Sequence, residues 1–144
     1  MVDLAHFGII SFTSEARVSK FVDDLEKGRI MATRCRVCGA KYFPPQADCS
    51  KCLSSEVEWF ELNPDAKLLT YTVVRFGPAG FETRSPYVIA IVELGDGLRM
   101  LGHVDHRIPE EEVRIGMKLR AVPVRLDGDR ITYEFQREDR VRDT

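Results

Sequence analysis

The chain has 144 residues, 44% of them hydrophobic, which is enough for one domain or two small ones with a buried core. Its 21 basic and 23 acidic residues leave a formal net charge of -2, too little positive charge to make nucleic-acid binding the default expectation. No apolar run approaches the length of a membrane span, and the first residues form no signal or transit pattern. We therefore expect a cytoplasmic protein without membrane association.

The N-terminal segment, residues 1–13, is unusually apolar for a chain terminus and contains Leu4, Phe7, Ile9, Ile10 and Phe12. Such side chains are unfavourable in a free tail, so the segment must pack on another protein or fold back onto its own chain. The sequence favours docking on a partner, because large apolar side chains typically anchor interfaces.

A helix is expected after this arm. Thr13 or Ser14 can cap it, and its apolar face is formed by residues at helical spacing, namely Val18, Phe21, Val22 and Leu25. Gly28 is the expected stop, because glycine readily adopts the left-handed conformation that ends many helices.

Four cysteines stand at Cys35, Cys38, Cys49 and Cys52, and the sequence contains no others. Two C-x-x-C pairs can each hold one side of a small soft cation, and tetrahedral zinc takes four thiolates at about 2.3 Å. Gly39 supplies a residue tolerant of positive φ directly after the first pair. The spacing therefore predicts a structural zinc ribbon, whose closed ligand set holds the fold and does not activate water.

The same four cysteines are also compatible with two disulfides or with a redox site. Two disulfides would suit a secreted chain, but no signal peptide is present, and a thioredoxin-like redox site would need one pair where the chain has two. Several cations surround the cysteines, and we expect them mainly to neutralise four zinc-bound thiolates: Arg34, Arg36, Lys41 and Lys51.

From about residue 66 the pattern changes to β structure. Five strands are expected, at residues 68–75, 87–94, 98–104, 118–126 and 130–136. The second is apolar almost throughout and should be buried on both faces, whereas Pro123 marks an edge or bulge in the fourth. A short helical turn at residues 109–112 lies between the third and fourth strands, as in a small Greek-key barrel of the OB type.

The fold class expected is therefore mainly β, with an N-terminal helix, a rubredoxin-like zinc ribbon and a five-stranded OB-type barrel. The expected organisation is an arm and helix at 1–28, the ribbon at 29–62, the barrel at 63–137 and a charged tail at 138–144.

The sequence offers no self-sufficient catalytic centre. All four cysteines are assigned to zinc, and no nucleophile elbow, Walker or dinucleotide-binding motif is present. His103 and His106 near the end of the third strand fit a surface turn better than a ligand pair. An OB barrel can bind single-stranded nucleic acid, but the second and third strands offer only Tyr87 and Arg99 for stacking and charge. A nucleic-acid-binding or general interaction module therefore stays the alternative function.

The order of these features resembles the zinc-ribbon OB-fold proteins of the DUF35 family. The resemblance covers residues 15–136 and rests on the shared order of its parts, none of which is diagnostic alone. These parts are LEKGRI at 25–30, CRVCG at 35–39, YFPP at 42–45, CSKC at 49–52, LTYTVV at 69–74, PYVIA at 86–90, VELGDG at 92–97, RIGM at 114–117 and the final Phe135.

The resemblance implies a non-catalytic subunit. Members of the family associate with thiolases, thiolase-like aldolases or hydroxymethylglutaryl-CoA synthase, where they scaffold the catalytic chain and help to hold the acyl-CoA. This chain would then form a hetero-oligomer with a thiolase-like catalytic subunit, which performs the Claisen or retro-Claisen chemistry. One member is the small subunit of a benzoylsuccinyl-CoA thiolase, which implies aromatic degradation as one setting. For contact with coenzyme A we expect the 76–86 loop with Arg75, Phe81 and Arg84, since arginine binds phosphate and a phenyl ring can cover adenine or pantetheine.

Overall fold

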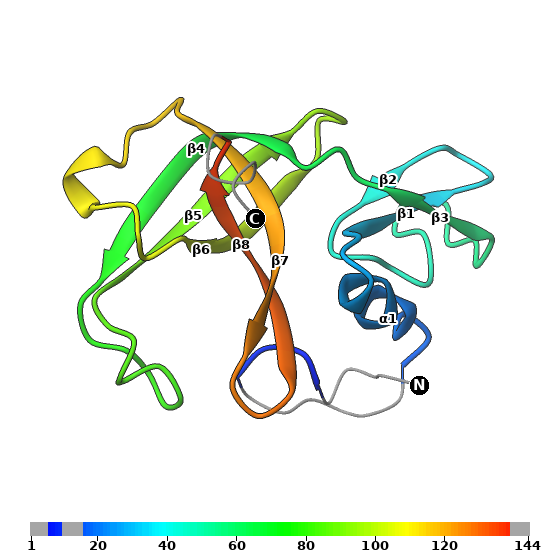
Figure 1. Cartoon of the computed structure of the whole chain (residues 1–144). Coiled ribbons are helices and arrows are strands. Elements are labelled where there is room, and N and C mark those ends of the chain that lie inside the picture. The colour runs from blue at the N-terminus through cyan, green and yellow to red at the C-terminus, as the bar shows by residue number, and fades with distance from the viewer. Residues whose placement is uncertain (1–5, 10–15, 139–144) are drawn as a thin grey trace.

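The computed structural model describes residues 6–9 and 16–138 and consists of a small ribbon and a larger barrel, with one helix beside the ribbon (Figure 1). The ribbon sheet has the strand order β2-β1-β3, formed by β1 (Met31–Cys35), β2 (Lys41–Tyr42) and β3 (Val57–Glu61). The fold class predicted from the sequence is confirmed. Within the described ranges, no helix is both long and apolar enough to cross a membrane.

The barrel is closed in the order β4-β5-β6-β8-β7. Its strands are β4 (Asp65–Val74), β5 (Tyr87–Leu94), β6 (Arg99–Val104), β7 (Lys118–Leu126) and β8 (Arg130–Arg137), and the 3-10 turn η2 (Glu110–Glu112) lies between β6 and β7. Neighbouring strands are antiparallel except β6 and β8, which run parallel. This connectivity is the five-stranded OB topology expected from the sequence.

The strand bounds differ from the predicted ones mainly at β4. It begins at Asp65, three residues early, because Asp65–Lys67 pair with Lys118–Arg120 of β7 and close the barrel. Pro123 of β7 pairs with Tyr133 of β8, beyond the stretch that pairs with β4, so its missing N–H breaks no bond on that side.

Burial of β5 on both faces was predicted and is wrong. Its side chains alternate, with Val88, Ala90, Val92 and Leu94 buried and the intervening residues half-buried or exposed. The inner side chains fill the barrel, whereas the outer face is covered only in part.

The helix α1 (Lys20–Glu26) is shorter than predicted. Ser19 occupies the N-cap position, and Val18 belongs to the preceding turn, while the predicted caps Thr13 and Ser14 lie outside the described residues. The predicted apolar face is otherwise confirmed, because Phe21, Val22 and Leu25 are buried. The helix ends as expected before Gly28, whose φ is 82° and whose N–H donates to the carbonyl oxygen of Leu25 at 3.0 Å.

One hydrophobic core joins helix, ribbon and barrel. The helix contributes Phe21, Val22 and Leu25 to the same cluster as Ala32 of β1 and Leu62 after β3. The barrel members of that cluster include Leu68, Val92, Met100, Leu119, Ile131 and Phe135. A seven-residue helix gains its stability from such packing and not from its intrinsic propensity.

Residues 6–9 of the N-terminal arm lie against the start of β8, and Figure 1 shows this dark blue segment beside the β7–β8 hairpin. Phe7 forms a parallel bridge with Ile131, and the N–H of Gly8 donates to the Ile131 carbonyl oxygen at 2.8 Å. The Phe7 ring lies 5.7 Å from that of Phe21, edge to face. Phe7 thus packs on this chain's own core, the alternative that the sequence left open. Three other apolar arm residues lie outside the described ranges, namely Leu4, Ile10 and Phe12.

β6 and β8 approach each other closely at Gly102. The Tyr133 hydroxyl of β8 donates to the Leu101 carbonyl oxygen of β6 at 2.6 Å. A Cβ atom on Gly102 would lie 2.9 Å from Cε2 of Tyr133 and 3.0 Å from Cζ of Phe135. Glycine is therefore required here for its lack of a side chain, which lets two rings cross over β6.

Candidate metal centre and barrel cavity

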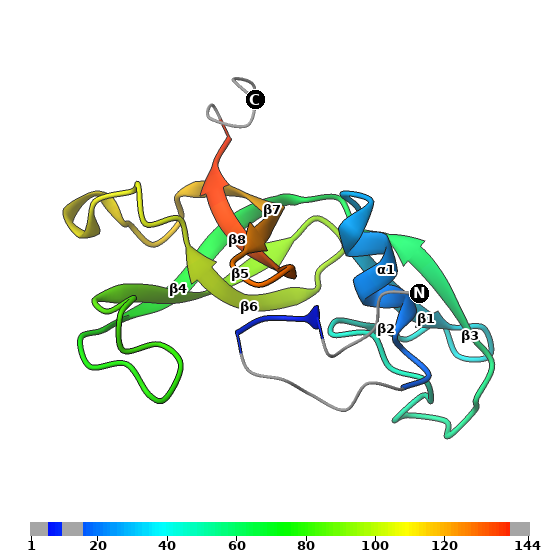
Figure 2. The ribbon, with the colours of Figure 1, turned by 60° about the horizontal axis from the view of Figure 1, so that its bottom comes forward.

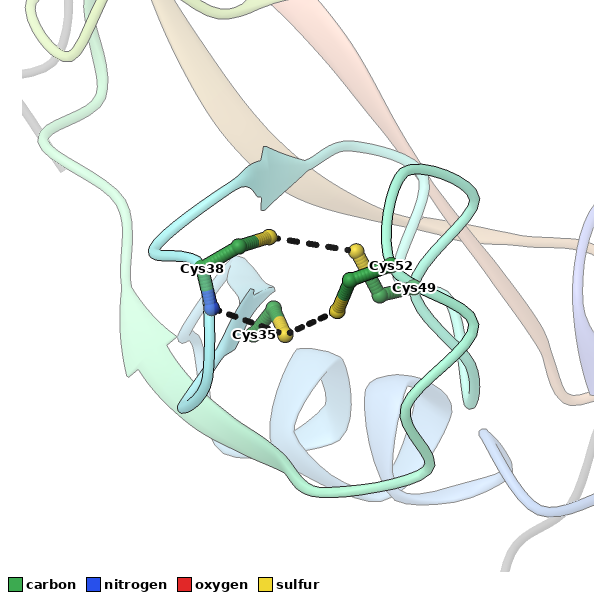
Figure 3. A group of neighbouring side chains, drawn as sticks. All are labelled: Cys35, Cys38, Cys49 and Cys52. Atoms are coloured by element: carbon green, nitrogen blue, oxygen red, sulfur yellow. Dashed lines mark hydrogen bonds between the residues drawn. The ribbon is translucent and has the colours of Figure 1, made fainter.

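The four cysteines converge from two loops of the ribbon (Figure 3). Cys35 and Cys49 are buried, and Cys38 and Cys52 are exposed. In each loop the residue after the second cysteine has positive φ, 79° at Gly39 and 62° at Leu53. These turns direct both sulfurs of a pair to one point. The sequence predicted this conformation for Gly39 but not for Leu53.

Backbone hydrogen bonds fix the two turns in the same way. The N–H of Gly39 donates to the Cys35 carbonyl oxygen, and the N–H of Leu53 donates to that of Cys49, both at 3.0 Å. The N–H of Cys38 also points at the Cys35 sulfur, 3.5 Å away. The ligand shell is therefore preformed by the backbone.

A zinc ion fits between these sulfurs. All four lie within 4.8 Å of one another, with Cys35 to Cys52 at 3.5 Å and Cys38 to Cys49 at 3.4 Å. A tetrahedron with Zn–S bonds of about 2.3 Å has sulfurs about 3.8 Å apart. The cluster thus matches a structural zinc site with four thiolates and no open position.

The protonation behaviour of the sulfurs also points to a cation. The Tyr42 hydroxyl, 3.2 Å from the sulfur of Cys49, is the main cause that lowers the pKa of Cys49 to about 6. A backbone hydrogen bond with Ser54 lowers the pKa of Cys52. The neighbouring Cys35 sulfur and burial outweigh this effect and raise that pKa to about 12. Four sulfurs this close cannot all ionise alone, and a dication bound between them would compensate the charge.

The cations near the ribbon loops pair with carboxylates. Arg34 and Arg36 both contact Glu58, at 2.7 Å and 3.6 Å, and Lys41 lies 3.4 Å from Asp96. These three side chains were expected mainly to neutralise the thiolates. Glu58 lies on β3 and Asp96 in the turn between β5 and β6, so these cations also have carboxylate partners. Neutralisation of zinc-bound thiolates by them and by Lys51 stays a prediction.

A cavity of about 630 Å³ lies between the barrel, the 76–86 loop and the N-terminal arm. The loop contributes Phe81, Thr83 and Arg84, and the arm contributes Phe7, Gly8 and Ile9. The loop and the arm lie on the same side of β6 in Figure 2. The volume is within the range typical of small-molecule sites.

Three rings form one wall of this cavity. Tyr87 and His103 stack with centroids 4.7 Å apart and planes 10° apart, and Phe81 lies 5.7 Å from His103 and 5.9 Å from Tyr87. The pairing of β5 with β6 sets Ile89 opposite His103, so Tyr87 is its diagonal neighbour on the same face. Burial and the nearby Arg84 guanidinium lower the pKa of His103, which favours a neutral ring.

The residues predicted to contact coenzyme A are only partly brought together. Phe81 and Arg84 line the cavity, whereas Arg75 does not and instead contacts Glu110 of η2 at 2.8 Å. His103 was predicted to belong to a surface turn, but it is half-buried within β6. Its stacking on Tyr87 could not be found from sequence, because it depends on the register of two strands.

The fold and the cysteine cluster together define the class of the protein, a zinc-ribbon OB-fold protein. Two family models match consecutive parts of the chain, "ChsH2, rubredoxin-like zinc ribbon domain" at residues 22–58 and "ChsH2, C-terminal OB-fold domain" at 59–131. A DUF35 domain-containing scaffold protein of Methanocaldococcus jannaschii is 41% identical over 116 residues, 77% of this chain and 82% of that protein. The chain belongs to the DUF35 family.

Two further relatives match this chain over very different shares of their own length. A DUF35 domain-containing scaffold protein of Pyrococcus furiosus is 35% identical over 97 residues, 67% of this chain and 70% of that protein. A probable enoyl-CoA hydratase alpha subunit of Thermomonospora curvata is 32% identical over 100 residues, 69% of this chain but 29% of that protein.

Solved structures share the fold at low identity. A chain of an Ltp2-ChsH2(DUF35) aldolase aligns with a TM-score of 0.74 and 23% identity, covering 88% of this chain and 98% of that one. A DUF35 family protein of Sulfolobus solfataricus aligns with a TM-score of 0.61 and 18% identity, covering 88% and 90%.

Proposed function

We propose that this chain is the non-catalytic, zinc-containing subunit of a thiolase-type acyl-CoA complex. The observation that carries the proposal is the commitment of all four cysteines to one cluster, which leaves no thiol for acyl transfer. Membership of the DUF35 family supports it, because relatives are described as scaffold proteins and one structural neighbour is part of an Ltp2-ChsH2(DUF35) aldolase.

In this proposal the work is divided between two chains. The thiolase-like partner performs the Claisen or retro-Claisen step, and this chain scaffolds it and helps to bind the acyl-CoA, which contributes to rate through positioning. Phe81 and Arg84 are the proposed contacts of this chain with the acyl-CoA, because both line the cavity. Arg75 is left out, since its guanidinium is engaged by Glu110.

A more specific proposal concerns the metabolic pathway and the cellular compartment of the complex. The resemblance to the small subunit of a benzoylsuccinyl-CoA thiolase makes aromatic degradation in the cytoplasm the specific candidate. A reduced compartment suits thiolates that hold zinc.

The experiment is co-expression with the thiolase-like protein encoded nearest to this gene. We expect a stable hetero-oligomer in size-exclusion chromatography with mass spectrometry. We also expect 3-oxoacyl-CoA thiolysis by the complex and none by this chain alone. Replacing the partner's nucleophilic cysteine by serine is the control, which should abolish turnover and leave the complex intact.

Two results would overturn the proposal. One is thiolysis by this chain alone that survives further purification. The other is a chain that binds no thiolase-type partner but prefers single-stranded DNA or RNA at nanomolar concentration, which supports the interaction-module alternative.

A further inference from the structure

We propose that Tyr42 is a positioning residue of the metal centre, whose hydroxyl holds the Cys49 thiolate by a hydrogen bond and so helps the ribbon to retain zinc. The Tyr42 hydroxyl lies 3.2 Å from the Cys49 sulfur. Among the described residues, no other side chain outside the cysteine cluster hydrogen-bonds one of its sulfurs. The inference concerns this chain's own residues and does not depend on a thiolase-type partner.

The two cysteine loops are built alike apart from this contact. In each loop the residue after the second cysteine has positive φ, and its N–H donates to the carbonyl oxygen of the first cysteine. The first cysteine of each loop, Cys35 or Cys49, is buried and the second is exposed. The hydroxyl of Tyr42 contacts only the sulfur of Cys49, so the two buried ligands are not equivalent.

The surroundings of the hydroxyl direct its proton to the sulfur. The Ser50 N–H donates to the Tyr42 oxygen at 3.0 Å, and the Ser50 Oγ lies 3.0 Å from the same oxygen. Since the Tyr42 oxygen already accepts a hydrogen bond from the loop, its own proton is available for an acceptor. A zinc-bound thiolate is such an acceptor, and hydrogen bonds to ionised groups are about twice as strong as neutral ones. Cys49 is only 1% exposed, so water does not readily replace this bond.

The backbone holds the Tyr42 ring in place. Tyr42 pairs with Thr33 of β1, which is fully buried. The next side chain, Phe43, packs edge to face on Phe21 of α1 and on Tyr133 of β8, with centroids 5.9 Å and 5.8 Å apart. The hydroxyl is therefore carried to the sulfur by a strand that the core fixes, as expected for a group that orients a metal ligand.

The consequence for zinc is electrostatic. Four thiolates around one dication repel one another, and a hydrogen bond donated to one of them withdraws part of its charge. The bond thus stabilises the loaded cluster, and it also makes the Cys49 sulfur a weaker electron donor to the metal. Removal of a group that bonds a metal ligand in this way typically lowers metal affinity about 10–100-fold.

The test compares Tyr42→Phe with the unaltered full-length chain, both loaded with zinc. The change removes one oxygen atom and keeps the ring. We expect zinc affinity, measured by competition with a chelator, to fall about tenfold or more. Tyr71→Phe is the matched control, the same change on an exposed tyrosine of β4, and should leave the affinity unchanged. Ser50→Ala keeps the backbone N–H and the bond to sulfur, so it should change the affinity little.

Cobalt(II) in place of zinc gives a readout that a loosened loop alone does not move. Tyr42→Phe should shift the sulfur-to-cobalt charge-transfer band to longer wavelength, because a thiolate without its hydrogen bond gives up charge more readily. The ligand-field bands of a tetrahedral site with four sulfurs should stay in place. In the unaltered chain loaded with an NMR-active cadmium isotope, the Tyr42 hydroxyl proton should exchange slowly with water and couple to the metal. This last measurement tests the bond without any variant.

Several results would overturn the inference. One is equal zinc affinity of Tyr42→Phe and Tyr71→Phe. Another is a loss of affinity without a shift of the charge-transfer band, or an equal loss in Ser50→Ala, because the hydroxyl would then only tie β2 to the second cysteine loop. A hydroxyl proton that exchanges freely and shows no coupling to cadmium would also exclude the bond. Zinc content and circular dichroism before the competition establish that each variant starts loaded and folded.

Discussion

The crossing of two rings over β6 makes Gly102 the sharpest position for a stability test. A methyl group there would lie 2.9 Å from Tyr133 and 3.0 Å from Phe135, well inside the roughly 3.5–4.0 Å at which carbon atoms pack. Neither ring can yield easily, because Phe135 is fully buried and the Tyr133 hydroxyl is bonded to the Leu101 carbonyl oxygen. Gly102→Ala should therefore push β6 away from β8.

The magnitude follows from two contributions. Overpacking of a well-filled core costs about 1–3 kcal/mol, and loss of the Tyr133 hydrogen bond adds roughly 1 kcal/mol. For 144 residues, an unfolding entropy of about 2.1 cal/mol/K per residue makes 1 kcal/mol equivalent to roughly 3 °C. Gly102→Ala should lower Tm by about 6–12 °C.

Calorimetry of the zinc-loaded protein measures this change. Gly95→Ala is the matched control, because its added Cβ would meet Asn63 at an ordinary 3.7 Å and should change stability by less than about 0.5 kcal/mol. Adding Tyr133→Val to Gly102→Ala should destabilise by less than the sum of the single changes, since one clashing ring is gone. Equal Tm values for the two alanine variants would refute the close-packing argument.

Three further predictions concern the metal, pH and the arm. Cys35→Ser or Cys52→Ser should reduce zinc from about one equivalent per chain to near none and make the protein insoluble, because structural zinc contributes folding free energy. Elemental analysis measures the zinc content, and a soluble, folded, zinc-free variant would contradict this prediction. The pKa of His103 is lowered on folding from about 6.5, so below that pH the unfolded chain binds more protons and stability should fall as the pH drops toward the folded value. Denaturant titrations between about pH 5 and 7 should show a shallower decline for His103→Gln, and identical slopes would rule out this residue as the cause. Phe7→Ala should destabilise the lone chain by about 1–3 kcal/mol, because the half-buried ring packs on Phe21, and an unchanged Tm would mean that the arm does not dock there in solution.

The features that were predicted correctly from the sequence depend on the local spacing of particular residue types. The C-x-x-C spacing determines which sulfurs can meet, and Gly39 fits the turn that follows Cys38. Strands β5 and β7 have their predicted bounds, because turn residues such as those at 95–97 and 127–129 delimit them. Local signals of this kind need no knowledge of the partner strand.

The features that sequence did not predict depend on contacts between distant segments. The helix α1 begins only at Lys20, after a turn at residues 17–19, and β4 begins early because β7 extends its pairing. The cavity is assembled from the arm, one loop and several barrel strands, so none of its segments carries a recognisable motif. Gly102 looks like any strand glycine until the positions of Tyr133 and Phe135 are known.

The core shared by helix, ribbon and barrel should restrain the ribbon from moving relative to the barrel. Small domains joined in one chain usually move relative to one another unless an apolar interface prevents it. Here α1 packs on both β1 and β8, Arg125 of β7 pairs with Glu26 of the helix, and Lys41 of the ribbon reaches Asp96 at the barrel. The distance from the zinc loops to the barrel cavity is thus set before anything binds. A complex that contacts both ends loses no hinge entropy on assembly, and a change that loosens α1 should weaken such a complex without touching either contact surface.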